Sequence, residues 1–174
     1  NTEKAKSVGT YTFGAMYRWV VWGNLLWVGD GDSNEIQLVD KTGKTTSRIR
    51  APWPARPFDR VAFDRMAKVE LADLPESQRS AYPGAMLSAK YLPRTEPFFK
   101  RFHVSPEGHL WIERFNIDAT APSECVVMAR NGSVVAKLTI PGGFEPKEIG
   151  DDYVLGIKRN RDGLETVAMY RIWK

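Results

Sequence analysis

The chain has 174 residues, of which 43% are hydrophobic and 26% are charged, and its formal net charge is +4. This composition is that of a soluble globular domain and excludes a disordered chain. The mild basic excess comes without a recognition motif, which argues against nucleic-acid binding, and no apolar run approaches the roughly 18 residues of a membrane-spanning helix.

The chain begins with Asn1 instead of Met, which indicates a processed or truncated chain. Strand-like residues first gather at 17–22, where aromatic and β-branched side chains occupy both alternating sets of positions. Because both faces of such a strand are apolar, we expect this segment to be buried on both sides.

Two stretches of the chain repeat one pattern. Each has a turn glycine followed by Leu-Trp and a β-branched residue, at 23–28 and again at 108–112. Each then runs through a strand into a second turn glycine and through another strand that stops at a proline. Four antiparallel strands in a meander are the makeup of a β-propeller blade. We therefore predict one blade over residues 17–52 and another over 98–141.

The segment between these blades, residues 53–97, has a different texture. Apolar residues recur at helical spacing over 58–74, which predicts a helix that ends at Pro75. Residues 77–89 fit either a second helix or an ordered loop. Insertions between blades often shape a binding surface.

A third, partial blade is predicted over residues 142–174, where a turn at 149–153 separates strand-like segments. The chain ends before an outer fourth strand, and residues 10–14 are the candidate to supply it. The predicted fold is thus all-β with a short helical insertion, an incomplete propeller in one domain spanning residues 1–174. Because closure takes at least four blades, other subunits, a second copy or a missing segment should cover the terminal sheets.

Three segments carry a family resemblance, at 108–112, 146–156 and 164–170. They resemble the C-terminal half of bacterial exported six-bladed β-propeller proteins of the NHL-like kind. The likeness covers residues 17–172, is most specific over 148–156, and lacks the family's first half. It implies a periplasmic or otherwise exported location and supplies no catalytic residues.

These features predict a non-enzymatic protein-interaction module or accessory subunit of the bacterial cell envelope. An extrinsic subunit of a respiratory or photosynthetic membrane complex would suit the resemblance. The alternatives are the C-terminal half of a propeller hydrolase or lyase, and half of a sugar- or peptide-binding propeller.

One loop resembles a calcium-binding loop, because four of its residues have side-chain oxygens that could bind the ion: Asp30, Asp32, Asn34 and Glu35. An EF-hand loop needs Gly at its sixth position and Glu at its twelfth. Here those positions hold Glu35 and Lys41, so the EF-hand reading fails. A polar hairpin loop is the favoured interpretation, and an irregular calcium site is the alternative.

Two further clusters suggest chemistry. Glu148, Asp151 and Asp152 could serve as a general acid and base, although acidic residues are common in turns. His103 and His109 flank a turn and could share a metal, but no third nitrogen or sulfur ligand accompanies them. We therefore expect no metal site, no cofactor and no catalytic residue.

The only cysteine, Cys125, lies in an apolar strand-like run and is expected to be a small buried hydrophobe. Partner binding is predicted instead for aromatic and basic residues in and next to the insertion: Trp53, Tyr82, Tyr91, Lys100 and Arg101. Aromatic side chains anchor interfaces, and modest basic patches steer association with acidic surfaces.

Overall fold

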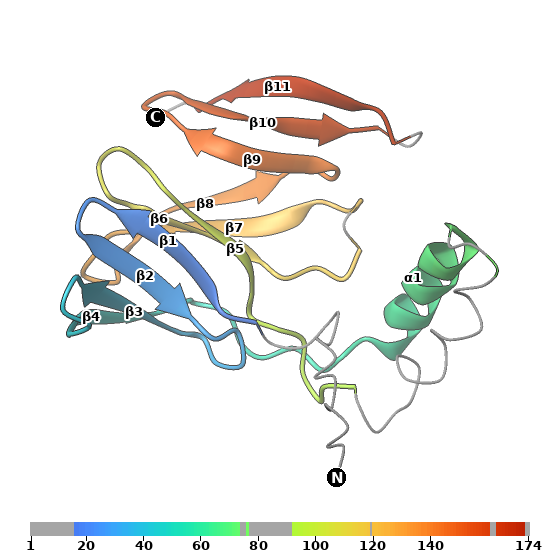
Figure 1. The fold of residues 1–174 in the computed structure, drawn as a ribbon, viewed down its shortest axis with the longest axis horizontal. Coiled ribbons are helices and arrows are strands. Elements are labelled where there is room, and N and C mark those ends of the chain that lie inside the picture. The colour runs from blue at the N-terminus through green and yellow to red at the C-terminus, as the bar shows by residue number, and fades with distance from the viewer. Residues whose placement is uncertain (1–15, 74–75, 77–91, 119, 161–162, 173–174) are drawn as a thin grey trace, which may run out of the picture.

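The computed structural model describes residues 16–73, 76, 92–118, 120–160 and 163–172, which form three antiparallel sheets and one helix (Figure 1). Sheet 1 contains β1 (Arg18–Trp22), β2 (Leu25–Gly29), β3 (Glu35–Asp40) and β4 (Thr45–Arg50). Sheet 2 contains β5 (Phe99–Val104), β6 (Leu110–Arg114), β7 (Ser123–Met128) and β8 (Val134–Ile140). Sheet 3 contains β9 (Phe144–Ile149), β10 (Tyr153–Arg159) and β11 (Glu165–Arg171).

The repeated glycines make the hairpin turns of sheets 1 and 2. Gly23 and Gly43 turn β1 into β2 and β3 into β4, with φ of 58° and 85°. Gly108 and Gly132 do the same in sheet 2, with φ of 83° and 88°. Side chains other than glycine rarely adopt such angles. The repeated glycines in the sequence therefore mark hairpin turns at equivalent places in sheets 1 and 2. Each of these sheets is a meander in which strands that follow one another in the chain are neighbours.

The sheets stack in chain order, with sheet 3 above sheet 2 and sheet 1 below it in the view of Figure 1. One buried apolar cluster joins sheets 1 and 2 and includes Trp27, Leu38, Phe99 and Ile112. A second joins sheets 2 and 3 and includes Trp111. Sheet 2 is therefore covered on both faces, whereas the described residues place a sheet against only one face of sheet 1 and one face of sheet 3.

The first strands of the sheets run beside one another, since β1 contacts β5 and β5 contacts β9. The expectation of a mostly β protein with antiparallel sheets and one short helix is confirmed. The described residues contain no closed sheet, so a closed propeller ring is not part of the observed fold.

The prediction that residues 17–22 are buried on both sides is wrong. Tyr17, Trp19 and Val21 are 73%, 65% and 56% exposed. Val20, which points to the other face of β1, packs against the core between sheets 1 and 2. The described part of the chain places no second sheet against the outer face of β1. The apolar side chains on that face are therefore exposed, although their sequence pattern is typical of a buried strand.

The insertion leaves and rejoins the sheets at one place, where Pro57 and Thr95 form a β-bridge. Helix α1 (Arg60–Asp73) follows, within the residues predicted to be helical. Asp59 caps its start, because its Oδ1 accepts a hydrogen bond from the Ala62 amide at 2.9 Å. The segments 77–89 and 10–14, for which a helix or loop and a closing strand were expected, lie outside the described residues. Within the described residues, no helix is long and apolar enough to cross a membrane.

Candidate functional site

The outer face of sheet 1 carries a strip of apolar side chains. On β1, Trp19 and Val21 are exposed. Their cross-strand neighbours on β2 are Val28 and Leu26, which share the same face and are half-buried. Large apolar side chains that sit side by side on an open sheet favour contact with another apolar surface.

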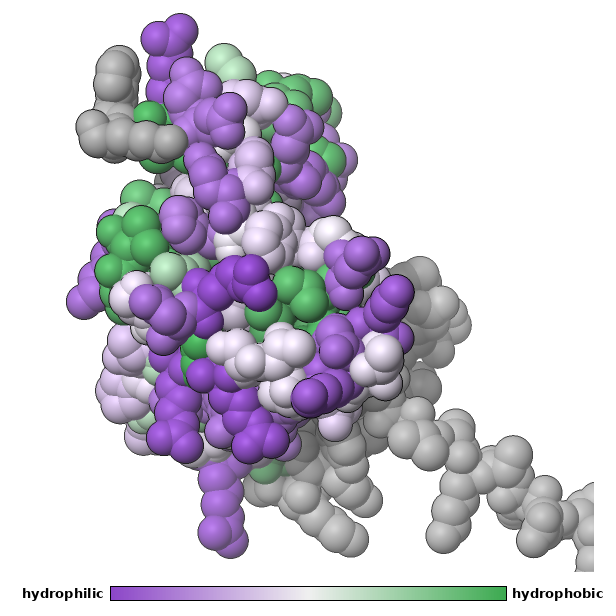
Figure 2. Space-filling model, turned by 90° about the vertical axis from the view of Figure 1, so that its left-hand side faces the viewer, coloured by the Kyte–Doolittle hydropathy of each residue, from purple (hydrophilic) through white to green (hydrophobic). Residues whose placement is uncertain are grey.

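Sheet 3 has a matching strip on its own outer face. Val167 and Met169 on β11 are 77% and 59% exposed. They pair across the strands with Ile157 and Leu155 on β10. Figure 2, in which sheet 3 again lies at the top, shows hydrophobic residues at the surface near that end. The stack therefore presents an apolar strip at both of its ends.

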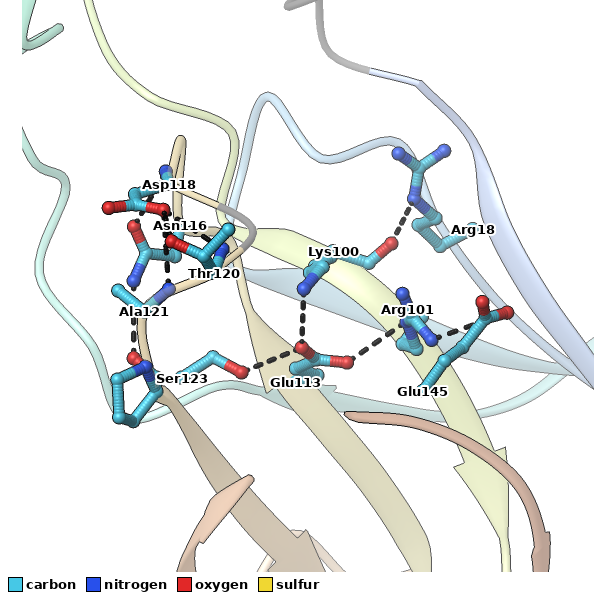
Figure 3. A network of polar contacts seen from close by, with 11 residues as sticks. Arg18, Lys100, Arg101, Glu113, Asn116, Asp118, Thr120, Ala121, Ser123 and Glu145 are labelled. Carbon is cyan, nitrogen blue, oxygen red and sulfur yellow. Dashed lines mark hydrogen bonds and ion pairs between the residues drawn. The ribbon is translucent and has the colours of Figure 1, made fainter. Parts of the chain in front are cut away.

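A network of charged groups joins the first strands of the three sheets (Figure 3). Its centre is the Glu113 carboxylate on β6, which is 2% exposed. Glu113 lies 2.9 Å from Lys100 Nζ and 3.0 Å from Arg101 Nε, and it accepts a hydrogen bond from Ser123 Oγ at 2.6 Å. A buried carboxylate is stable only when it is paired and hydrogen-bonded in this way.

The same network extends to both neighbouring sheets. From β1, Arg18 Nε donates to the Lys100 carbonyl at 2.6 Å. From β5, Arg101 Nη1 reaches Glu145 Oε1 on β9 at 3.5 Å. Polar contacts at the first strands therefore hold sheets 1, 2 and 3 together, in addition to the two apolar cores.

Lys100 and Arg101 were predicted to bind a partner, and the structure places both largely inside this network, with side chains 22% and 25% exposed. A β-bulge between Phe99 and Arg101 lets both consecutive cations reach Glu113. Partner binding by these two residues stays a prediction. The central residue, Glu113, was missed, although a carboxylate within the apolar strand Leu110–Arg114 was a usable signal.

His103, two residues beyond Arg101 on β5, is half-buried, and its Nε2 atom is shielded from water and has no hydrogen-bond partner among the described residues. Burial, reinforced by nearby Arg101, lowers the pKa of His103 from 6.5 to about 4. The imidazole is therefore neutral at physiological pH. A neutral imidazole suits packing between sheets 2 and 3. It carries no charge that could attract an anionic ligand.

We expect acid to weaken the fold through His103. Below about pH 6.5 the unfolded chain binds a proton that the folded chain resists until about pH 4. Stability from this group is therefore complete above pH 6.5 and is lost as pH falls toward 4, at up to about 1.4 kcal/mol per pH unit. Urea unfolding of wild type and His103→Gln from pH 7 to 4 tests this. The variant should show a shallower slope, and identical slopes would contradict the assignment.

Trp53, predicted to bind a partner, is half-buried after β4 and packs against the core between sheets 1 and 2. The Arg114 guanidinium stacks over its ring, 5.4 Å from the centroid. Tyr82 and Tyr91, the other two aromatic residues of that prediction, lie outside the described residues. Of the three, only Trp53 can therefore be placed in a structural setting.

Three of the four calcium candidates use their side chains in protein contacts, and the fourth, Asp32, is exposed and contributes its backbone amide. Asp30 Oδ1 accepts backbone hydrogen bonds from Asp32 and Ser33 at 3.1 and 3.2 Å, which is a local turn. Asn34 Nδ2 donates to the Ala51 carbonyl at 3.1 Å. Glu35 lies within 3.8 Å of Arg48 and 3.7 Å of Arg50. The described part of the chain contains no group of three or more acidic, His or Cys side chains placed to hold a metal.

The acidic cluster forms the turn between β9 and β10. Glu148 accepts a hydrogen bond from the Tyr153 hydroxyl, which raises the pKa of Tyr153. Asp151 and Asp152 are exposed. The Asp152 carbonyl accepts a hydrogen bond from the Ile172 amide at 2.7 Å and so ties the end of β11 to this turn. These contacts give the cluster a role in the turn.

Cys125 is buried between sheets 2 and 3, as expected for a small hydrophobe. Burial raises the pKa of its thiol to about 12. At neutral pH the group is therefore a thiol and not the thiolate that nucleophilic chemistry requires. His109, the other residue of the proposed histidine pair, lies beside the β5–β6 turn, where its amide donates to Ser105 Oγ at 3.3 Å.

No model of a known protein family matches the chain, and no curated protein matches it either.

Proposed function

We propose that this chain is a non-enzymatic interaction module, an accessory subunit that packs the outer faces of sheets 1 and 3 against β-sheets of a neighbouring protein. The observation that carries the proposal is the pair of apolar strips at the two ends of the stack. Trp19 and Val21 mark one strip, and Val167 and Met169 mark the other. Contiguous apolar surface of this kind is typical of interaction sites.

The internal contacts of the stack support the same proposal. Sheet 2 has two apolar faces, and each is covered by a neighbouring sheet. The outer faces of sheets 1 and 3 combine an apolar strip with charged side chains, such as Glu35 and Arg48 on sheet 1 and Arg159 and Glu165 on sheet 3, and no described sheet lies against them. A partner that offers an apolar sheet would repeat a contact that the molecule already makes twice.

A propeller-type arrangement is part of the proposal. In support, each complete sheet is a four-stranded meander, and the first strands of successive sheets lie side by side. Among the described residues, sheet 3 has three strands, and no described strand pairs with the outer edge of β11. Propellers use radial repetition of such sheets to protect their edges. In this arrangement the missing sheets complete a ring of six, as the resemblance to NHL-like propellers implies.

A non-enzymatic role agrees with the state of the reactive groups. Of the Glu113 carboxylate, Oε1 is held by Lys100 and Ser123, and Oε2 is ion-paired with Arg101 without a hydrogen bond. Cys125 is a buried thiol at neutral pH. For location, we propose the periplasm or another exported compartment of a bacterium, on the outer surface of a respiratory or photosynthetic membrane complex. This part of the proposal has the family resemblance as its support.

The contact faces can be tested with three matched Val→Lys variants. We expect the unmodified chain to self-associate at micromolar concentration in sedimentation velocity, because its apolar strips have no other cover. Val21→Lys on β1 and Val167→Lys on β11 should shift the chain toward monomer, since each buries a charge in the contact. Val135→Lys, at a 52% exposed position on the edge strand β8, is the control and should leave association unchanged. Equal association in all four proteins would contradict docking through these faces.

A further inference from the structure

A cavity of about 370 Å³ opens between the segment that follows β4 and the outer strands of sheet 2. Its lining comes from two parts of the chain far apart in sequence, namely Pro52, Trp53, Glu124, Cys125, Val126, Lys137, Leu138 and Thr139. This volume lies in the range of about 300–1,000 Å³ that is typical of small-molecule sites. Glu124, Val126, Lys137 and Thr139 share one face of sheet 2, so the Trp53 ring meets mostly polar side chains there, whereas the Cys125 and Leu138 side chains point to the other face, toward sheet 3.

The aromatic wall of this cavity is held in place by a polar chain of contacts. Arg114 stacks over Trp53 and donates from Nη2 to the Pro54 carbonyl at 3.2 Å. Arg114 Nη1 also lies 3.1 Å from Glu124 Oε2, and Arg56 Nη2 lies 3.0 Å from Glu124 Oε1. Trp53 is therefore a fixed platform, and a rigid first layer is what a binding site needs.

The charges at the cavity are unevenly matched. Glu124 is neutralised by two guanidinium groups, those of Arg56 and Arg114. Lys137 on β8 has no carboxylate partner in the part of the chain that the structure describes. The unmatched charge at the wall is consequently positive, and Thr139, two residues along the same strand, adds a hydroxyl on the same side.

We infer that this cavity binds a small organic anion whose carboxylate is carried on a six-membered ring that can stack on an indole. The ring packs against Trp53, whose indole offers a broad apolar face. The carboxylate forms a charge-assisted hydrogen bond with Lys137, and Thr139 offers a further hydrogen bond. An aromatic acid and a uronic acid share this chemistry. The inference is independent of the proposed docking function, because the cavity is lined by the segment after β4 and by β7 and β8, and by none of the residues of the two apolar strips.

Isothermal titration calorimetry with three probes tests this inference on the full chain. The probes are benzoate, glucuronate and the uncharged benzyl alcohol. We expect saturable binding of at least one of the two acids, and the stronger of them identifies the ring. Benzyl alcohol should bind about tenfold more weakly than benzoate if the aromatic acid is preferred, because it lacks the carboxylate that Lys137 pairs with.

Two variants assign the binding to the cavity. Lys137→Gln should weaken binding of the acid about tenfold, whereas Lys158→Gln, at an exposed position on β10, should leave it unchanged. Trp53→Leu should also weaken binding, with Trp19→Leu on β1 as its control. Trp53 also packs against the core, so Trp53→Leu could fail to fold. In that case Lys137→Gln, at an exposed position, decides the outcome. Absence of saturable binding for both acids up to millimolar concentration, or equal binding by Lys137→Gln and Lys158→Gln, would overturn the inference.

Discussion

Replacing Trp27 with alanine is expected to destabilise the protein by about 3–5 kcal/mol. Trp27 is the largest of the fully buried side chains and lies in the core between sheets 1 and 2. Its removal leaves a cavity lined by side chains of two different sheets. Those sheets are already fixed by their backbone hydrogen bonds, so the cavity cannot collapse completely. The variant therefore loses the free energy of burying the indole and also bears the cost of the remaining cavity.

Urea unfolding followed by circular dichroism measures this effect. Trp19→Ala is the matched control, since Trp19 is 65% exposed on the outer face of β1. In monomeric conditions it should change the free energy of unfolding by about 0.5 kcal/mol or less. Near-equal effects of the two substitutions would mean that the core between sheets 1 and 2 is misplaced.

Glu113→Gln is expected to give the second largest loss of stability, about 2–3 kcal/mol. The amide keeps the shape of the side chain but removes the negative charge that two cations share. Lys100 then loses its carboxylate partner, and Arg101 beside it keeps only the longer contact with Glu145 at 3.5 Å. The expected loss is smaller than for a fully buried pair, because both cations are about one quarter exposed and can move toward water.

Glu124→Gln is a suitable control for this prediction. Glu124 also contacts two cations, Arg56 and Arg114, but its side chain is 54% exposed. Ion pairs of an exposed carboxylate contribute about 0–1 kcal/mol, and the largely buried partner Arg114 keeps its contacts with the Pro54 carbonyl and the Trp53 ring, so this variant should lose less stability than Glu113→Gln. If Glu113→Gln unfolds at the same urea concentration as Glu124→Gln, the network at the first strands does not stabilise the stack.

The meander sheets could be predicted from the sequence because their signals are local. A glycine that must adopt positive φ, as Gly108 and Gly132 do, fixes a turn from two or three residues. The Leu-Trp strands follow these turns directly. Helix α1 was likewise visible as apolar spacing over 58–74. Each of these features depends on neighbours in the chain and not on distant contacts.

The surroundings of individual side chains could not be read in the same way. The apolar pattern of β1 suits burial, but whether a sheet lies against Trp19 depends on the order in which sheets stack. The pair Lys100 and Arg101 looked like a surface patch, because only tertiary packing and a β-bulge bring Glu113 between them. The cavity at Trp53 forms with strands more than seventy residues further along the chain, and no local pattern encodes that meeting.

The central claim is that the outer faces of sheets 1 and 3 are contact surfaces. Hydrogen–deuterium exchange of the full chain, compared between dilute and concentrated samples, tests it most directly because it locates the contact on the strands. We predict slower exchange at high concentration in peptides that cover β1 and β11, and unchanged exchange in β8. Protection that appears in β8 or the β3–β4 turn while β1 and β11 stay unchanged would contradict the claim, as would exchange that is independent of concentration throughout.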